Sequence, residues 1–228
     1  MTYSYRMSES FQLPLFPLTT VLLPGMNLPL HIFEARYRQL IGDLLKLPEA
    51  DRKFGVVAIK AGWEVGSDNL PVLHQVGTIA KVRRIKHLPD GKFDISTAGA
   101  DRFEIKEVSS ILAPYLVAKV ELLDPVASAA GANLIAAAGE AYANYLKVIG
   151  ESTVSVYAQL PSEAPALANL LIATLTGNTL EQQRLLEMNS AEEKLKKLIT
   201  IFNRESILLQ TVPSIPAPYL TGVSLSLN

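Results

Sequence analysis

The spacing of apolar residues changes near Asp124-Pro125, which divides the chain into two parts with different periods. Before this point apolar and polar residues mostly alternate, and a period of two is typical of half-buried β-strands. After it the period becomes 3.6, which predicts amphipathic helices. Strands followed by helices indicate an α+β fold with a mainly antiparallel sheet. We therefore expect a β-rich subdomain over residues 1–124, a helical bundle over 125–210 and an extended tail over 211–228.

Turn signals and one helix interrupt the strands of the first part. Pro24-Gly25 predicts a turn in which Gly25 has a positive φ, and Pro89-Asp90-Gly91 predicts a hairpin turn. Pro14 and Pro17 lack an amide donor, so the first strand should be irregular or lie at an edge. The predicted strands cover residues 28–32, 54–59, 79–88, 92–97, 103–105 and 116–122. Apolar residues at helical spacing predict a helix that ends at Pro48; they are Phe33, Tyr37, Leu40, Ile41, Leu44 and Leu45.

The second part contains several helix signals. Apolar stripes predict helices over about 134–149 and 167–175, and Gly177-Asn178 is a typical stop. Thr179 with Gln182 and Ser190 with Glu193 both match the capping box, in which side chains satisfy free amides of the first turn. The second of these boxes begins the most regular helix, which continues to Leu209.

The amino-acid composition and the net charge exclude several classes of function. The 228 residues include no cysteine, which excludes disulfides, thiolate nucleophiles and cysteine-ligated zinc. A net charge of -1 provides no overall attraction to nucleic acid or anionic lipid. Residues 1–10 lack the pattern of a signal peptide, and no apolar run approaches the ~18 residues of a membrane-spanning helix. These features predict a cytoplasmic location.

The usual motifs of catalysis are absent from the sequence. It contains no phosphate-binding G-x-x-x-x-G-K-[ST] loop, no G-x-G-x-x-G and no G-x-S-x-G. His31, His74 and His87 do not form the i, i+4 pair that places two metal ligands on one helix face. We therefore expect no catalytic residue, no metal ion and no cofactor. Spacing alone does not exclude a Ser–Lys dyad, so a hydrolase with an unrecognised site is kept as an alternative.

One cluster of basic residues precedes the hairpin turn: Lys81, Arg83, Arg84, Lys86 and His87. On a regular strand Lys81 and Arg83 share one face while Arg84 and Lys86 share the other. The charge is then divided between two faces, which favours a solvated hairpin over a phosphate-binding patch.

A stretch near the N-terminus is far more specific than these patterns. Residues 13–37 read LPLFPLTTVLLPGMNLPLHIFEARY. This run resembles the opening of the amino-terminal, substrate-recognition domain of ATP-dependent Lon proteases, in which an L-P-L-F-P-L strand, a P-G turn and an I-F-E-x-R-Y segment follow one another. Further segments agree in order, at residues 76–80, 89–91, 99–103 and 185–195. The departures are local: Ala35 stands where proline is usual, and Thr19-Thr20 where glycine or an acidic residue is common.

The resemblance implies a PUA-like, six-stranded, mostly antiparallel pseudo-barrel followed by a helical bundle. In that family the domain binds unfolded or damaged polypeptides or specific partner proteins. The ATPase motifs and the protease dyad of the family have no counterpart in these residues. We therefore expect a non-catalytic protein-binding module, an adaptor in protein quality control whose partners are client polypeptides and a separate protease or chaperone. RNA binding is the alternative from another class, because PUA-like folds also occur in RNA-modifying proteins.

Two groups of candidate residues are expected; Trp63 is included because it lies between glycines, where an aromatic side chain can contact a ligand or cover the core. Those expected to contact a peptide are Trp63, Glu64, Glu34, Arg36 and Arg102, near the junction of barrel and bundle, where concave sites tend to form. Those expected to hold the fold are Pro14, Phe16, Pro17, Pro24, Gly25, Phe33, Tyr37, Gly77, Gly99 and Phe103. A second interpretation of Glu34, Arg36 and Arg102 is structural, because buried and hydrogen-bonded charges usually fix architecture.

Overall fold

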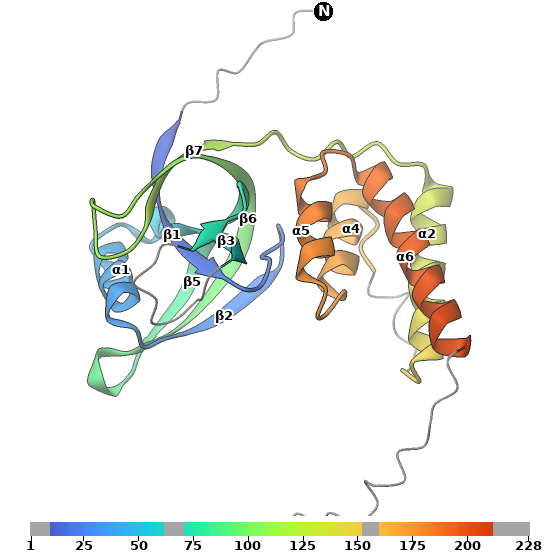
Figure 1. Ribbon diagram of the computed structural model, residues 1–228, viewed down its shortest axis with the longest axis horizontal. Coiled ribbons are helices and arrows are strands. Elements are labelled where there is room, and N and C mark those ends of the chain that lie inside the picture. The colour runs from blue at the N-terminus through green and yellow to red at the C-terminus, as the bar shows by residue number, and fades with distance from the viewer. Residues whose placement is uncertain (1–9, 62–70, 152–159, 212–228) are drawn as a thin grey trace, which may run out of the picture.

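The computed structural model describes residues 10–61, 71–151 and 160–211. A β-rich subdomain and a bundle of helices lie side by side, and one long connection joins the end of β7 to α2 (Figure 1). The order of elements confirms the expected α+β class. The expected tail over 211–228 lies outside the described residues from position 212 onward.

The sheet of the first subdomain closes on itself. Antiparallel pairing runs from β1 through β7, β6 and β5 to β3, and β3 returns to β1 by a parallel pairing. The strand β2 pairs with the first half of β6, and the two-residue strand β4 extends β3. Within the described residues the sheet therefore has seven strands where six were expected, and the additional one is short. The strands are β1 (Phe11–Leu18), β2 (Asn27–Ile32), β3 (Lys53–Ala61), β4 (Val72–Leu73), β5 (Val76–His87), β6 (Phe93–Ser109) and β7 (Val117–Leu122).

The strand β1, which contains two prolines, is not an edge strand, because its first half pairs with β7 and its second half pairs with β3. Its first residues pair with β7 as far as Pro14, and its last residues, including Pro17, pair with β3. This change of partner is the irregularity that the two prolines allow, since each strand half needs hydrogen bonds in only one direction. Of the two expected alternatives, an irregular strand or an edge position, the structure shows the irregular strand.

The turns agree with the sequence prediction. Gly25 has a φ of 82°, and in the hairpin turn Asp90 and Gly91 have φ values of 61° and 67°. The helix α1 (Ala35–Leu45) ends before Pro48, and short 3-10 turns follow at Glu49–Asp51 and Pro89–Gly91. Phe33 precedes α1 and is 49% exposed, so its expected place on the apolar helix face is wrong.

The strand β5 contains a bulge that changes how its basic residues are distributed. Val82 pairs with Thr97 and Arg84 with Ser96, so Arg83 is one residue more than the partner strand supplies. An additional residue resets the alternation of side chains beyond it. The expected division of the basic cluster between two faces is therefore wrong. Lys81, Arg83, Arg84 and Lys86 are all exposed, whereas Val82 and Ile85 pack against the barrel core.

Aromatic and glycine residues of the family-like segments pack the barrel. Phe16 stacks on Tyr37 with ring centroids 4.0 Å apart, and Phe103 is fully buried. Gly99 lies against the turn, because a Cβ at this position would be 2.2 Å from the carbonyl oxygen of Leu23. This close approach brings the Pro24-Gly25 turn onto β6, where the Gly25 amide donates to the Gly99 carbonyl at 2.9 Å.

The second subdomain buries an apolar core between its helices. They are α2 (Ala132–Val148), α4 (Ala164–Ala173), α5 (Thr179–Glu187) and α6 (Ala191–Thr211). Ser190 accepts the Glu193 amide at 3.3 Å, as expected for this cap. The other expected cap is wrong by one residue, because Asn178 accepts the Glu181 amide and Thr179 instead donates to Thr19 of the barrel. None of the helices in the described residues is long and apolar enough to span a bilayer.

Candidate functional site

Leu23 joins the two subdomains by entering the core of the helical bundle. It is 1% exposed and belongs to the same apolar cluster as Leu167, Leu171 and Phe202. The loop that holds it, between β1 and β2, contains the Pro24-Gly25 turn of the family-like motif. This motif therefore serves the junction as well as the barrel.

Arg102 is the polar counterpart of this apolar contact. The side chain is 3% exposed, and its two terminal nitrogens donate four hydrogen bonds. The acceptors are the carbonyl oxygens of Leu186, Met188 and Asp124 and Oδ1 of Asn189, at 2.8–3.0 Å. Burial lowers the pKa of Arg102, yet a guanidinium keeps its charge in proteins. These contacts tie β6 to the end of α5, to the connection before α6 and to the segment that follows β7.

Lys194 on α6 is buried beside this guanidinium. It is 1% exposed, and no ion pair within the described ranges includes it. Burial, together with the positive charge of Arg102, lowers its pKa to about 7. The junction therefore contains a cation whose charge depends on pH near neutrality.

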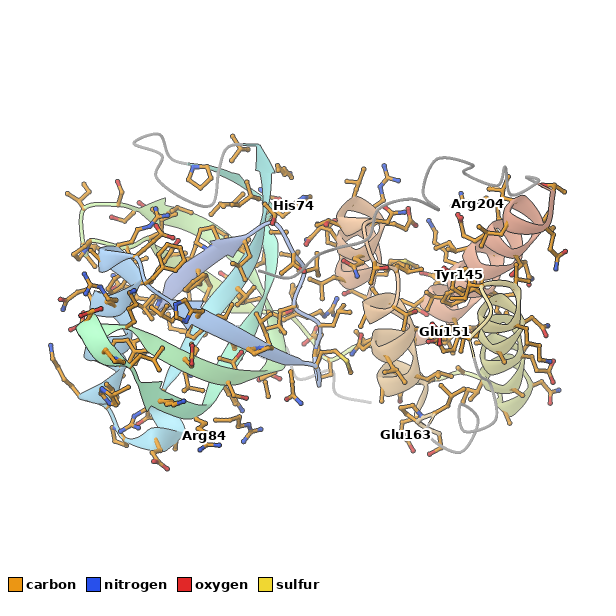
Figure 2. The ribbon with its side chains drawn as sticks, turned by 90° about the horizontal axis from the view of Figure 1, so that it is seen from below. His74, Arg84, Tyr145, Glu151, Glu163 and Arg204 are labelled. Atoms are coloured by element: carbon orange, nitrogen blue, oxygen red, sulfur yellow. The ribbon has the colours of Figure 1, made fainter. Side chains whose placement is uncertain are left out.

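Other polar side chains cross the same junction. Asn169 donates to the Pro24 carbonyl at 3.2 Å, and Gln183 donates to the Val76 carbonyl at 3.0 Å. His74 lies 3.7 Å from Glu187, and burial is the main cause that lowers its pKa. Figure 2 shows His74 on the side of the barrel that faces the helices. The described contacts thus make the junction a packed interface.

Glu34 and Arg36 pair with each other at the start of α1. Nε and Nη2 of Arg36 approach Oε2 of Glu34 at 3.0 and 2.9 Å, and the guanidinium lies 4.6 Å from the ring centroid of Tyr37. A cavity of about 120 Å³ lies beside them between β1, β2 and α1. Its lining includes Phe16, Pro17, Phe33, Glu34 and Tyr37. The structure thus brings several motif residues together around one small cavity.

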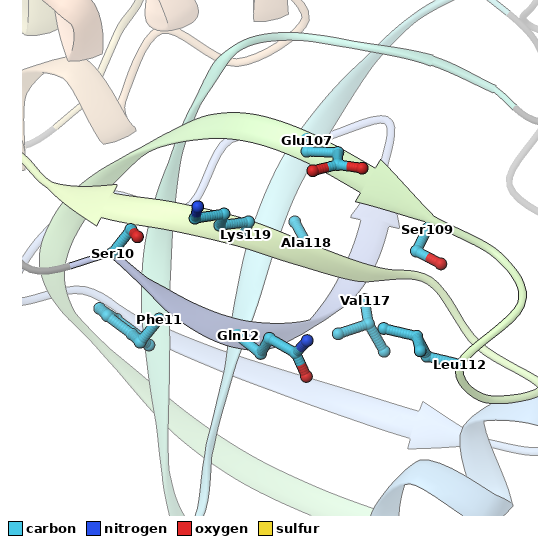
Figure 3. A pocket seen from close by; sticks show the side chains of 9 residues that line it. All are labelled: Ser10, Phe11, Gln12, Glu107, Ser109, Leu112, Val117, Ala118 and Lys119. Carbon is cyan, nitrogen blue, oxygen red and sulfur yellow. The ribbon is translucent and has the colours of Figure 1, made fainter.

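Two larger cavities flank the end of β6. One of about 460 Å³ lies between the start of β1, β7 and the end of β6 (Figure 3), and its lining includes Gln12, Glu107, Leu112 and Lys119. The other, of about 280 Å³, is lined by residues 105–108 of β6, by Pro71, Leu73 and residues 74–75 near β4, and by Leu116. Glu107 lines both cavities, so the end of β6 separates them.

Leu112 of the larger cavity and Val108 of the smaller one are exposed, as are their apolar neighbours in the same connection and on β4. Ile111 and Leu112, in the connection from β6 to β7, are 93% and 61% exposed; Val108 on β6 and Val72 on β4 are 40% and 57% exposed. We call these four residues the apolar rim. Sequence reasoning missed it, because Ile111 and Leu112 lie outside any regular element. Two consecutive aliphatic residues between Ser110 and Pro114 were the available signal.

Tyr115 anchors the connection that carries Ile111 and Leu112. Its hydroxyl donates to Oδ2 of Asp43 on α1 at 3.0 Å. Burial and this carboxylate raise the pKa of Tyr115 to about 12, and hydrogen bonds, that of Lys46 first, hold the pKa of Asp43 below its usual value. The connection that carries Ile111 and Leu112 is therefore attached to α1.

Replacing Tyr115 with phenylalanine removes only the hydroxyl that bonds Asp43. We expect a loss of about 1–2 kcal/mol in the free energy of unfolding, because hydrogen bonds to charged groups contribute more than neutral ones. Chemical denaturation of Tyr115→Phe beside the unchanged protein measures it. A variant with unchanged stability would mean that the bond does not hold the connection.

The remaining candidates from the sequence are Trp63, Glu64 and the histidines. Trp63 and Glu64 lie outside the described residues. Nδ1 of His31 is 2.7 Å from Oδ1 of Asp94 on the barrel surface. In the described ranges no three metal-ligating side chains gather in one place.

The barrel and the bundle together form the fold of Lon amino-terminal domains. The Lon N-terminal domain protein from Xanthomonas campestris superposes with a TM-score of 0.60 at 22% identity, covering 83% of this chain and 98% of that one. The N-terminal domain of the Mycobacterium avium complex Lon protease superposes with a TM-score of 0.64 at 19% identity, covering 85% and 98%. At these identities the comparison establishes the fold.

The sequence establishes the family. The family of the ATP-dependent protease La (LON) substrate-binding domain matches residues 12–204, so the chain belongs to it. Lon protease 2 of Herpetosiphon aurantiacus is 32% identical over 209 residues, and Lon protease 1 of Thermus thermophilus is 29% identical over 202. These matches cover 89% and 85% of this chain and 25% of each relative. The chain thus corresponds to about a quarter of these proteases.

Proposed function

We propose that this chain is a non-catalytic polypeptide-binding domain that captures unfolded client proteins in the cytoplasm. Its membership of a family described as the Lon substrate-binding domain is the observation that supports this proposal most. The matched region corresponds to about a quarter of a Lon protease in length, and the sequence carries no recognised ATPase or Ser–Lys motif. Binding, rather than hydrolysis, is the activity that these residues support.

We further propose that clients contact the apolar rim. Exposed aliphatic side chains beside cavities lose water when apolar groups cover them, and each well-buried aliphatic side chain contributes about 1.5–3 kcal/mol. An unfolded polypeptide exposes such groups along its length, whereas a folded one has them inside. The rim therefore selects unfolded chains by a property that all of them share.

The other expected contact residues receive separate roles in this proposal. Glu34 and Arg36 stand beside the small cavity near Phe33, which forms a second contact for a client side chain. Arg102 acts structurally, because its guanidinium is already hydrogen-bonded within the junction. Bound clients pass to a separate protease or chaperone, which makes the chain an adaptor.

The proposal is tested by binding of a labelled, permanently unfolded polypeptide, followed by fluorescence anisotropy. We expect the unchanged chain to bind this polypeptide and not the folded form of the same protein. The double variant Ile111→Asp/Leu112→Asp should bind about tenfold more weakly, a loss of about 1.4 kcal/mol. Charged side chains at these positions are disfavoured under an apolar ligand.

A matched control comes from the far end of α6. Ile207 and Leu209 are 61% and 49% exposed, so Ile207→Asp/Leu209→Asp adds the same charge to another apolar surface. We expect this variant to bind as the unchanged chain does. Equal weakening in both double variants, or no binding by the unchanged chain, would contradict the proposal.

A further inference from the structure

Four basic side chains form a one-sided strip along β5. Lys81, Arg83, Arg84 and Lys86 are all exposed, because the bulge at Arg83 brings the cluster to one face. Figure 2 shows Arg84 at the side of the barrel, pointing away from it. We call these four residues the basic strip.

The basic strip has no ion-pair partner among the described residues. No ion pair in the described part of the chain includes any of the four residues. Asp94, which pairs with Lys86 in the strand register, has its Oδ1 bonded to His31. The neighbour of Lys81 on β3 is another cation, Lys53. A strip of free positive charge on a nearly neutral protein is a place for an anionic ligand.

We propose that the basic strip binds an acidic segment of an extended polypeptide. Alternate residues of a β-strand repeat at about 7 Å, and an extended peptide presents alternate side chains at the same interval. Arg84 and Lys86 are alternate residues of β5, so carboxylates at every second position of the segment can each face one of these two cations. This inference rests on the proposed function, because the acidic segment belongs to the client that the apolar rim holds.

The same observations favour a peptide over a nucleic acid. Single-stranded nucleic acids bind where aromatic side chains stack with the bases, and the strip consists of Lys and Arg only. The net charge of -1 also gives no long-range attraction to a polyanion. The strip is short, which suits a local segment of a client better than a long phosphate backbone.

The test uses two unfolded polypeptides of equal length, one with aspartate at alternate positions of a short segment and one with asparagine there. We expect the whole unchanged chain to bind the aspartate form about five- to tenfold more tightly at low salt, with the difference shrinking as salt rises. Arg83→Glu/Arg84→Glu should remove this difference and leave binding of the asparagine form unchanged.

The control is Lys147→Glu/Lys197→Glu, which changes the net charge by the same amount on exposed helix positions. It should keep most of the preference for aspartate. The inference is overturned if both double variants lose the preference equally, if the unchanged chain has none, or if an oligonucleotide competes at the strip more strongly than the aspartate form. If the unchanged chain bound the aspartate form but not the asparagine form, the proposed function would be contradicted instead, because binding of the asparagine form depends on the apolar rim.

Discussion

Replacing Arg102 with methionine is expected to lower the free energy of unfolding by about 3–5 kcal/mol, because four hydrogen bonds from a charged donor are lost together. Methionine fills part of the volume but donates no hydrogen bond. The carbonyl oxygens of Leu186, Met188 and Asp124 each lose a donor, and an unsatisfied buried acceptor is costly. Without the charge of Arg102, the buried cation of Lys194 is no longer repelled, and this offsets a part of the loss of stability.

Chemical denaturation measures this effect against two reference variants. Arg184→Met removes an arginine on α5 whose side chain is 62% exposed and whose ion pair with Glu181 spans 3.5 Å, so we expect a change below about 1 kcal/mol. Arg102→Lys keeps the charge but not the planar fork, so its stability should lie between those of the methionine variant and the unchanged chain. If Arg102→Met were as stable as Arg184→Met, the proposed structural role of Arg102 would be wrong.

The second large effect is a dependence of stability on pH that comes from Lys194. In the folded chain burial lowers its pKa to about 7, from 10.5. Between these two values the unfolded chain binds more protons at this residue than the folded chain does. The free energy of unfolding therefore rises with pH above 7, by at most about 1.4 kcal/mol per pH unit. Below the folded pKa both states are protonated, and the contribution is at its lowest.

Replacing Lys194 with methionine removes this titration. We expect Lys194→Met to be more stable than the unchanged chain at pH 6, by about 1–4 kcal/mol, because an apolar residue replaces a buried charge. The difference should shrink between pH 7 and 9. Denaturation curves of both proteins at pH 6, 7, 8 and 9 measure this difference in stability. Groups that titrate in the same way in both proteins contribute nothing to it. A difference that stays constant with pH would show that Lys194 does not titrate in this range.

Much of the barrel could be predicted from local patterns. The turns at Gly25 and at Pro89-Asp90-Gly91 need positive φ values that few residue types adopt. The local sequence is therefore enough to predict them. The partner change of β1 and the bulge at Arg83 are different, because they depend on which strand lies opposite. A period-two pattern carries no such information, and the division of the basic cluster was therefore predicted wrongly.

The candidate site was harder to predict from the sequence than the fold was. Arg102 stood out only through its place in the family-like segment, and its carbonyl acceptors are distant in sequence, such as Leu186. Ile111 and Leu112 belong to no repeating pattern, so only their exposure in the folded chain marks them. The pKa of Lys194 depends on burial against Arg102, a contact that the helical period of α6 does not specify.

The central claim is that an unfolded polypeptide binds at the apolar rim. Amide hydrogen exchange of the whole chain, with and without a saturating unfolded polypeptide, tests it most directly. We predict slower exchange over residues 105–116 and 71–75, with the exchange of α2 and of the far end of α6 unchanged. Slower exchange confined to the helical bundle, in a sample where binding is complete, would contradict the account.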